Sequence, residues 1–255
     1  MSEAAKDGPA ICVDGVTQRF GARMIFHDVR FEVARGEVFV ILGGSGCGKS
    51  TLMKQMIGLL PPSEGTIEVL GTDMYQDRRA VLSRIGVMFQ SGALFGSMTL
   101  LENVMLPLEV YTDLSPRARA EIAQVKLGLV GLGDAAFLRP AEISGGMAKR
   151  AGIARALALD PPLLFLDEPS AGLDPITSAG LDQLILDLRK LLGATFVVVT
   201  HELASILAIA DRCIMLDREA KGIIATGNPR TLRDEATHPT VRAFFRRETI
   251  HEAPT

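Results

Sequence analysis

The chain has 255 residues, of which 47% are hydrophobic and 22% are charged, and its formal net charge is −3. This globular composition can bury a sizeable core, and the slightly negative charge gives no electrostatic support for binding nucleic acid. Cys12, Cys47 and Cys213 show neither metal-ligand spacing nor a disulfide framework, which favours a reducing cytoplasm. We find no run of about 18 apolar residues and no secretory pattern at the N-terminus, so we expect neither a membrane span nor a signal peptide.

The first part of the chain predicts mainly β structure. The polar residues 1–9 are expected to be loose. Alternating runs at residues 11–20 and 24–33 predict half-exposed antiparallel strands, whereas the solid apolar run at 38–42 predicts a strand that is buried on both faces. Residues 66–71 and 84–90 predict further short strands.

From about residue 91 to 160 the pattern becomes helical, with Ser115 as a candidate N-cap and Pro116 at the first helical position. The β pattern returns at residues 163–169 and 195–201. Residues 212–227 predict an antiparallel hairpin, and the polar tail is helix-prone with an end that we expect to fray. A helix between the two strands is predicted from periodic apolar residues at Leu181, Leu184, Ile185, Leu188 and Leu191.

These segments predict a single α/β domain with a mainly parallel core sheet, an antiparallel β layer and an α-helical subdomain. We place the core at about residues 10–90 and 161–228 and the helical subdomain at about 91–160. The C-terminal tail covers about 229–255.

A glycine-rich loop follows the buried strand. Its sequence, GGSGCGKS, fits the pattern G-x-x-x-x-G-K-[ST] and lies between a predicted strand and a predicted helix, as a phosphate loop requires. Backbone amides would bind phosphate, Lys49 would reach the β and γ phosphates, and Ser50 would offer its hydroxyl to Mg²⁺. The alternative is an ordinary glycine-rich turn. The expected ATP-binding loop comprises Gly43, Gly44, Ser45, Gly46, Cys47, Gly48, Lys49, Ser50 and Thr51.

Cys47 lies inside this loop. We interpret it as a small residue that fits there and not as a catalytic nucleophile. A helix N-terminus can lower the pKa of a thiol, so we expect Cys47 to be open to alkylation in the absence of ATP.

Polar residues end three of the predicted strands. Asp167 would lie at the carboxyl end of its strand and hold Mg²⁺, and Glu168 would orient or deprotonate the attacking water. His201 could complete the γ-phosphate side, and Gln90 could contact metal or water. Taken one at a time, each of these residues could equally be a solvated surface group.

A second glycine turn stands far along the chain, where ISGGMAKRAGIARA at residues 143–156 leads into a basic amphipathic helix. Such a helix start is also suited to bind an anion. Two phosphate-binding helix ends in one chain require either two ligands or one ligand that is shared between two chains.

With these motifs in this order, the chain resembles the ATP-binding cassette (ABC) ATPases over nearly its full length. The resemblance implies a P-loop NTPase fold, ATP hydrolysis with Mg²⁺, and a head-to-tail homodimer in which the signature turn of one copy caps the ATP bound by the other. Ser144, Gly145 and Gly146 would bind that γ-phosphate, Asp174 would lie at the seam, and Phe20 would stack on adenine. Phe20 could alternatively be an ordinary core or edge aromatic.

The signature departs from the usual Leu-Ser-Gly-Gly-Gln at its two ends, where this chain has Ile143 and Met147. The serine and both glycines, which contact the phosphate, are retained. The loss of the glutamine amide puts one ribose or interface hydrogen bond in doubt.

Residues 89–108 and 143–178 look most like the ATPase of Mla-type (maintenance of lipid asymmetry) phospholipid transporters. That resemblance implies membrane permease subunits, an MCE-domain lipid-binding protein and a STAS-domain subunit. It places the chain peripherally on the cytoplasmic face of the inner membrane, where it would serve lipid traffic between inner and outer membranes. Importers of amino acids or other solutes share much of this pattern.

Two other classes stay open. A soluble ABC protein of translation or DNA repair usually carries two cassettes, a coiled coil or a zinc module, which this sequence lacks. A nucleotide kinase or GTPase would explain the phosphate loop but not the second glycine turn or His201.

Two segments are candidate partner surfaces. The apolar residues 93–108 would contact the permease, or would be ordinary domain core. The tail would pack on the partner ATPase or fray, and its candidate contacts are Phe244, Phe245, Arg246 and Arg247.

Overall fold

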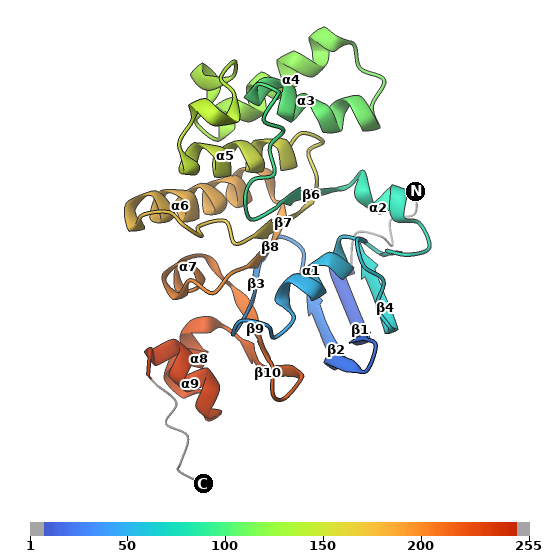
Figure 1. Ribbon diagram of the computed structural model, residues 1–255, viewed down its shortest axis with the longest axis vertical. Coiled ribbons are helices and arrows are strands. Elements are labelled where there is room, and N and C mark those ends of the chain that lie inside the picture. Colours follow the sequence, from blue (N-terminus) through green and yellow to red (C-terminus); the bar gives the residue numbers. More distant parts are fainter. Residues whose placement is uncertain (1–7, 249–255) are drawn as a thin grey trace.

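The computed structural model describes residues 8–248, so the expected loose residues 1–7 and the end of the tail at 249–255 lie outside the described residues. Two β-sheets lie next to each other, with most of the helices on one side (Figure 1). The smaller sheet is antiparallel and has the strand order β2-β1-β4-β5. Its strands are β1 (Ile11–Phe20), β2 (Arg23–Val33), β4 (Glu64–Val69) and β5 (Thr72–Asp73).

The larger sheet has the order β10-β9-β3-β8-β7-β6 and is parallel except for β10, which forms the expected antiparallel hairpin with β9. The predicted α/β fold with a mainly parallel core sheet and an antiparallel layer is therefore confirmed. The strands of this sheet are β3 (Val38–Gly43), β6 (Ile85–Met88), β7 (Leu163–Asp167), β8 (Thr195–Val199), β9 (Arg212–Asp217) and β10 (Gly222–Gly227).

The larger sheet separates two hydrophobic cores, and the side chains of its central strands alternate between them. In β3, Val40 and Leu42 pack on the helical side, whereas Phe39 and Ile41 pack toward the antiparallel sheet and α1 (Lys49–Met56). All four side chains are fully buried. A strand covered on both faces needs apolar residues at every position, which explains the unbroken apolar run and confirms its prediction.

Three helices lie between β6 and β7 in the chain and form the upper part of the molecule in Figure 1: α3 (Leu100–Tyr111), α4 (Pro116–Leu129) and α5 (Gly145–Ala156). As expected, Ser115 caps α4 through the amide of Ala118, and Pro116 is its first residue. Short 3-10 turns, η2 (Gly133–Ala135) and η3 (Pro140–Glu142), connect α4 to α5.

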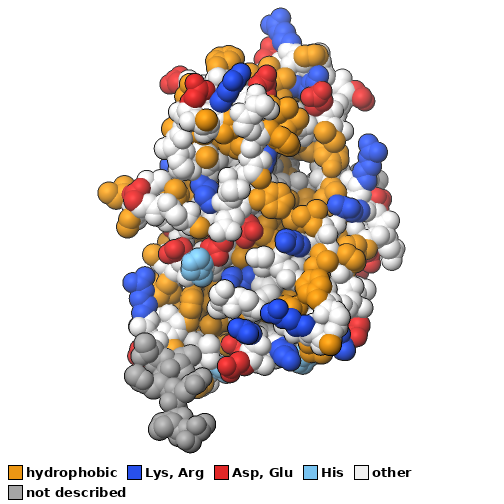
Figure 2. Space-filling view, in the orientation of Figure 1, with side chains coloured by type: hydrophobic (Ala, Val, Ile, Leu, Met, Phe, Trp, Pro, Cys, Tyr) orange, Lys and Arg blue, Asp and Glu red, His pale blue; other side chains and the backbone are white. Residues whose placement is uncertain are grey.

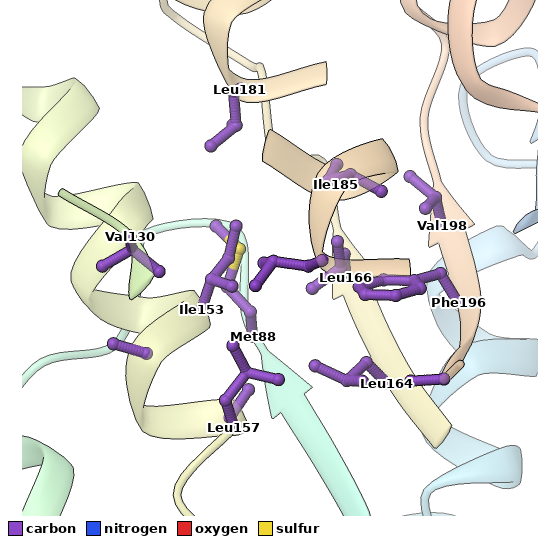
Figure 3. Packing of buried hydrophobic residues seen from close by; sticks show 14 of the residues in the cluster. Met88, Val130, Ile153, Leu157, Leu164, Leu166, Leu181, Ile185, Phe196 and Val198 are labelled. Atoms are coloured by element: carbon purple, nitrogen blue, oxygen red, sulfur yellow. The ribbon is translucent and has the colours of Figure 1, made fainter. Parts of the chain in front are cut away.

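Helix α5 packs directly on the larger sheet. Ile153 of this helix and Leu157, which directly follows its last residue, lie against Met88 of β6 and the inner residues of β7 (Figure 3). A Cβ atom on Gly86 would lie 2.2 Å from the carbonyl oxygen of Ala156, so only glycine allows this close approach of β6 and α5. The helix that carries the second glycine turn is thereby fixed to the sheet.

The remaining helices are α2 (Arg78–Leu82), α6 (Pro175–Leu192), α7 (Leu203–Ile209), α8 (Pro229–Glu235) and α9 (Pro239–Arg246). The predicted helix at α6 is present, with Leu181, Ile185 and Leu188 buried. Leu191 also lies in this helix, but it is 65% exposed in the last turn before Gly193 ends the helix. Within residues 8–248, no helix is both long enough and apolar enough to cross a membrane.

The tail helices pack on the chain itself. Val241 and Phe245 of α9 are buried in the core on the helical side of the larger sheet. The tail is therefore ordered through Glu248, and a wholly frayed tail was the wrong expectation. Phe245 was also wrongly expected to contact a partner, because its side chain is buried in the core of this chain.

Replacing Phe245 with alanine should remove a buried ring and leave a cavity. We expect Phe245→Ala to lower the free energy of unfolding by about 3 to 5 kcal/mol, measured by urea denaturation. Phe137→Ala is the matched control, because Phe137 is 77% exposed and its loss should change stability by only about 0.5 kcal/mol. Equal effects of the two substitutions would contradict the packing of α9.

Candidate functional site

The carboxyl ends of β3, β8 and β7 form one edge of the larger sheet. Ile41 of β3 and Asp167 of β7 both pair in register with Val199, the last residue of the central strand β8. The residues that follow these three strands must therefore lie close together. The shared register brings the glycine-rich loop, Asp167, Glu168 and His201 to a common site.

The glycine-rich loop leads from β3 into α1, as expected. Gly43 has a φ angle of 146°, and a Cβ atom there would lie 2.2 Å from the carbonyl oxygen of Leu216. No side chain caps the start of α1, because the capping residue is Gly48. The first amides of this helix are thus left for a ligand at its N-terminus, which suits a phosphate group.

Lys49, the first residue of α1, lies across the loop that precedes it. Its ammonium group donates to the carbonyl oxygens of Gly43 at 2.8 Å and Gly44 at 3.1 Å. The positive charge is therefore held at the same loop as the free amides, where it can bind an anion. Of the other loop residues, Gly44, Ser45, Gly46 and Ser50 are exposed, and Thr51 is half-buried.

Cys47 corrects one expectation. Its side chain is 1% exposed and belongs to the core between the two sheets, because it points away from the mouth of the loop. Burial raises the pKa of its thiol, and this effect outweighs the opposing charge of Lys49. The predicted accessible thiol with a lowered pKa was wrong, and only the backbone of Cys47 faces the candidate site.

Glu168 and His201 are paired at the sheet edge. Nδ1 of His201 lies 2.8 Å from Oε1 of Glu168, and the Glu168 side chain is only 11% exposed. The second carboxylate oxygen, Oε2, is buried without a hydrogen-bond partner among the described residues. This unpaired oxygen could accept a hydrogen bond from a bound water molecule only if the side chains that cover it move aside.

Glu168 also has an unusual backbone. Its φ angle is 46°, in the left-handed region that residues other than glycine seldom adopt. Its amide donates to the carbonyl oxygen of Val199 at 2.8 Å, which continues the ladder between β7 and β8 by one residue. Glu168 is thus held beside the end of β8, which is followed by His201.

Asp167 ends β7 and is half-buried. Burial raises the pKa of its carboxyl group, Glu168 raises it further, and Lys149, Lys54 and Lys49 oppose the rise. Such a desolvated pair of carboxylates favours the approach of a cation.

The oxygen atoms of Ser50, Gln90 and Asp167 fit the ligand preference of Mg²⁺. In nucleotide sites this ion takes one or two carboxylates plus phosphate oxygens and water. Residues 8–248 contain no cluster of three His, Cys, Asp or Glu side chains that would bind a metal alone. A Mg²⁺ site here would therefore be completed by the phosphates of a bound nucleotide. Gln90 is exposed in the turn after β6, which ends earlier, at Met88.

The second glycine turn forms the start of α5. Ser144 is the N-cap, and its Oγ accepts from the amide of Met147 at 3.2 Å. A Cβ atom on Gly146 would lie 2.7 Å from Cγ2 of Thr177, whereas Gly145 is exposed. Ile143 and Met147 pack against the helical-side core, which gives a physical reason for apolar residues at these two positions.

Asp174 and Phe20 lie at other exposed positions. Asp174 caps α6, where its Oδ1 accepts from the amides of Ile176 and Thr177, both at 3.0 Å. The hydrogen bond from the Thr177 side chain is the main reason why the pKa of Asp174 is lowered. Phe20 ends β1 and is 49% exposed, so its ring is open to a ligand.

The two glycine turns are not joined within the chain. Among the described residues, no hydrogen bond or ion pair connects Ser144, Gly145 or Gly146 with the loop at residues 43–50. Within this chain, each turn is therefore a separate helix start.

Sequence reasoning did not single out Lys149, which lies in α5 and is 7% exposed. Its ammonium group donates to the carbonyl oxygens of Gln90 and Glu168. A lysine in a basic amphipathic helix is expected to face solvent, so the local pattern gave no indication that Lys149 would bind backbone carbonyls.

The candidate permease segment at residues 93–108 is only partly a surface. Leu100, Val104 and Leu108 are buried in the helical-side core, and Leu94 is packed against it, so for these residues the alternative of domain core was right. Phe95 is 55% exposed.

Apolar side chains gather over the upper and central part of the face in Figure 2. Exposed apolar residues of the helical segment are Phe95, Val110, Tyr111, Leu114, Val125, Phe137 and Leu138.

Comparison with known proteins gives the following relatives. A family model described as ABC transporter matches residues 26–171. The "Probable ribonucleotide transport ATP-binding protein mkl" of Mycobacterium leprae (strain TN) is 44% identical over 242 residues, covering 93% of this chain and 69% of that protein. The "Intermembrane phospholipid transport system ATP-binding protein MlaF" of Escherichia coli (strain K12) is 41% identical over 229 residues, covering 88% and 84%.

Solved structures match most of the fold. The cbiO1 protein from Clostridium perfringens, part of the ABC transporter complex cbiONQ, has a TM-score of 0.81 at 27% identity and covers 90% of this chain and 92% of its own. A dimeric structure of a post-hydrolysis state of the ATP-binding cassette MJ0796, bound to ADP and Pi, has a TM-score of 0.77 at 30% identity and covers 86% and 98%. The expected fold class is confirmed by both.

The burial of Cys47 predicts its reactivity. In the native protein at pH 8 without nucleotide, we expect iodoacetamide to label Cys12, which is partly exposed, and to leave Cys47 unmodified. Labelling in urea is the control and should modify both thiols. If mass spectrometry found Cys47 labelled as fast as Cys12 in the native protein, the buried orientation would be wrong.

Proposed function

The chain belongs to the ABC transporter family as one of its ATPase subunits, and we propose that two copies pair head to tail around ATP to drive phospholipid transport. The observation that carries the pairing is that each chain has two glycine turns, each at a helix start, with no hydrogen bond between them among the described residues. A head-to-tail dimer would bring the turn at Ser144 of one copy opposite the loop that contains Lys49 of the other. The dimeric ADP-bound relative supports this arrangement.

Within each nucleotide site, the chain's own loop would bind the phosphates through its amides and Lys49. Ser50, Gln90 and Asp167 would hold Mg²⁺, which supplies positive charge to the phosphate oxygens. Phe20 would stack on the adenine ring. The partner copy would complete the site with its own Ser144, Gly145 and Gly146, and Asp174 would lie at the seam between the copies.

Glu168 would act as the general base. Its buried, unpaired Oε2 would accept a hydrogen bond from the attacking water once the side chains that cover it move aside, and its other oxygen is held by His201. With Nδ1 protonated, His201 donates to Glu168, which fixes both side chains at the γ-phosphate side of the site.

The hydrogen bonds to the γ-phosphates and the cost of association are similar in free energy, as a switch between dimer and monomer requires. A charge-assisted hydrogen bond is worth roughly 1.5 to 3 kcal/mol, so two or three to each γ-phosphate at two sites give on the order of 6 to 18 kcal/mol. Association of two proteins costs an estimated ~4 to 15 kcal/mol. Because these terms are comparable, cleaving the γ-phosphate would be enough to open the dimer.

Phospholipid as the cargo is supported by the 41% identity to the Escherichia coli protein named for intermembrane phospholipid transport. The chain would then act peripherally at the cytoplasmic face of the inner membrane. Its partners would be membrane permease subunits, an MCE-domain lipid-binding protein and a STAS-domain subunit. A second candidate is import of another solute, favoured by the 44% identity to a probable ribonucleotide transport protein.

The dimer proposal is tested with Glu168→Gln. The amide keeps the shape of the side chain but cannot take a proton, so we expect ATP hydrolysis to fall by about 10² to 10⁴-fold. ATP should then convert this variant into stable dimers, measured by light scattering after size-exclusion chromatography.

Two samples serve as controls for this experiment. The same variant with ADP and the wild-type protein after turnover should both be monomeric. A Glu168→Gln protein that stays monomeric with ATP would contradict the proposed pairing.

The permease surface is tested with Phe95→Asp. Phe95 is exposed, so the charge should leave folding and the ATPase activity of the isolated subunit unchanged while reducing co-purification with the permease. Leu191→Asp, an exposed apolar residue at the end of α6, is the matched control and should co-purify normally. Normal co-purification of both variants would remove Phe95 from the interface.

A further inference from the structure

Lys149 joins three segments of the chain through one buried ammonium group. The residue lies in the first half of α5 and is 7% exposed. Its Nζ donates to the carbonyl oxygen of Glu168 at 2.9 Å and to that of Gln90. Burial lowers the pKa of this ammonium group, while the charges of Glu168 and Asp167 oppose that shift. The lysine thus bonds to the backbone of the segments that follow β6 and β7.

The contact with Glu168 acts on a strained residue. A φ angle of 46° is strained for a residue other than glycine and persists only when the surroundings fix the backbone. The peptide groups of Glu168 are held through its amide by Val199 and through its carbonyl by Lys149 at 2.9 Å and by the amide of Ala171 at 3.2 Å. Without Lys149 the carbonyl keeps only the longer bond from Ala171, so the backbone can relax toward an ordinary conformation that would move the carboxylate.

The contact with Gln90 is part of a longer attachment. Further along α5, Arg155 donates to the carbonyl oxygens of Gly92 at 2.8 Å and Ala93 at 2.7 Å. A Cβ atom on Gly92 would lie 3.0 Å from the carbonyl oxygen of Ala148, which shows how closely this segment follows the helix. The backbone from Gln90 to Ala93 is therefore bound along one side of α5 and must move with it.

We propose that Lys149 is a positioning residue that couples the two nucleotide sites of the dimer. This inference rests on the proposed head-to-tail pairing. The first turn of α5 carries Ser144 and meets the ATP of the partner, whereas Glu168 and Gln90 serve the ATP bound by the chain's own loop. Lys149 connects these groups directly, so binding at one site sets the position of Glu168 at the other.

The test compares Lys149→Met, which keeps the length of the side chain without its donors, with Lys149→Arg, which can still donate to two carbonyls. The control is Lys126→Met, because Lys126 is equally buried, at 6% exposed, but pairs with Asp160 away from the site. ATP affinity, kcat and the Hill coefficient for ATP are measured for each protein, and urea unfolding confirms that each is folded.

We expect Lys149→Met to bind ATP with nearly unchanged affinity, to lose about 100-fold in kcat, and to show a Hill coefficient near one. Lys149→Arg should recover most of kcat, and Lys126→Met should match the wild type. Wild-type kcat and cooperativity in Lys149→Met, or a loss of ATP affinity as large as the loss of kcat, would overturn the coupling role. ATP-induced dimers of Glu168→Gln report the pairing separately, so a failure of the pairing and a failure of the coupling are distinguishable.

Discussion

The parallel hydrogen-bond ladder that joins β3, β8 and β7 determines where the chemistry can occur. Its register places the ends of three strands at one edge, so that the loop of Lys49 and the pair formed by Glu168 and His201 meet although they are far apart in the sequence. Both faces of these strands are buried, which leaves only the strand ends open to a ligand. The glycine-rich loop, Asp167, Glu168 and His201 all follow or end strands at this edge.

Helix α5 carries the proposed second binding surface and ties it to the first. Its N-terminus presents Ser144 outward, while its interior is fixed to the sheet through the close approach at Gly86 and through Lys149. Under the proposed coupling, a ligand that displaces the first turn would also act on the backbone of Glu168. We propose that this connection lets binding at the exposed turn influence the buried carboxylate.

The sequence was sufficient for features that depend on local pattern. The phosphate loop, the strand that precedes it and the cap at Ser115 each follow from neighbouring residues. Features that depend on which distant segment of the chain packs over a residue were predicted less well. Cys47 points into a core formed with the antiparallel sheet, Phe245 is covered by the chain's own helical-side core, and Lys149 binds backbone carbonyls from two other segments. Residue type and spacing carry no information about such contacts, because the partners lie far along the chain.

The central claim is that each nucleotide is bound by two chains, and mixed dimers test it most directly. A dimer of one Lys49→Ala chain with one Ser144→Ala chain keeps one intact site if the sites are shared, whereas a dimer of wild type with the double variant keeps none. Purified through different tags, the first dimer should retain one ATP and the second should retain no ATP. The opposite result, with ATP retained only by the dimer that contains a wild-type chain, would show that each site lies within one chain and would contradict the account.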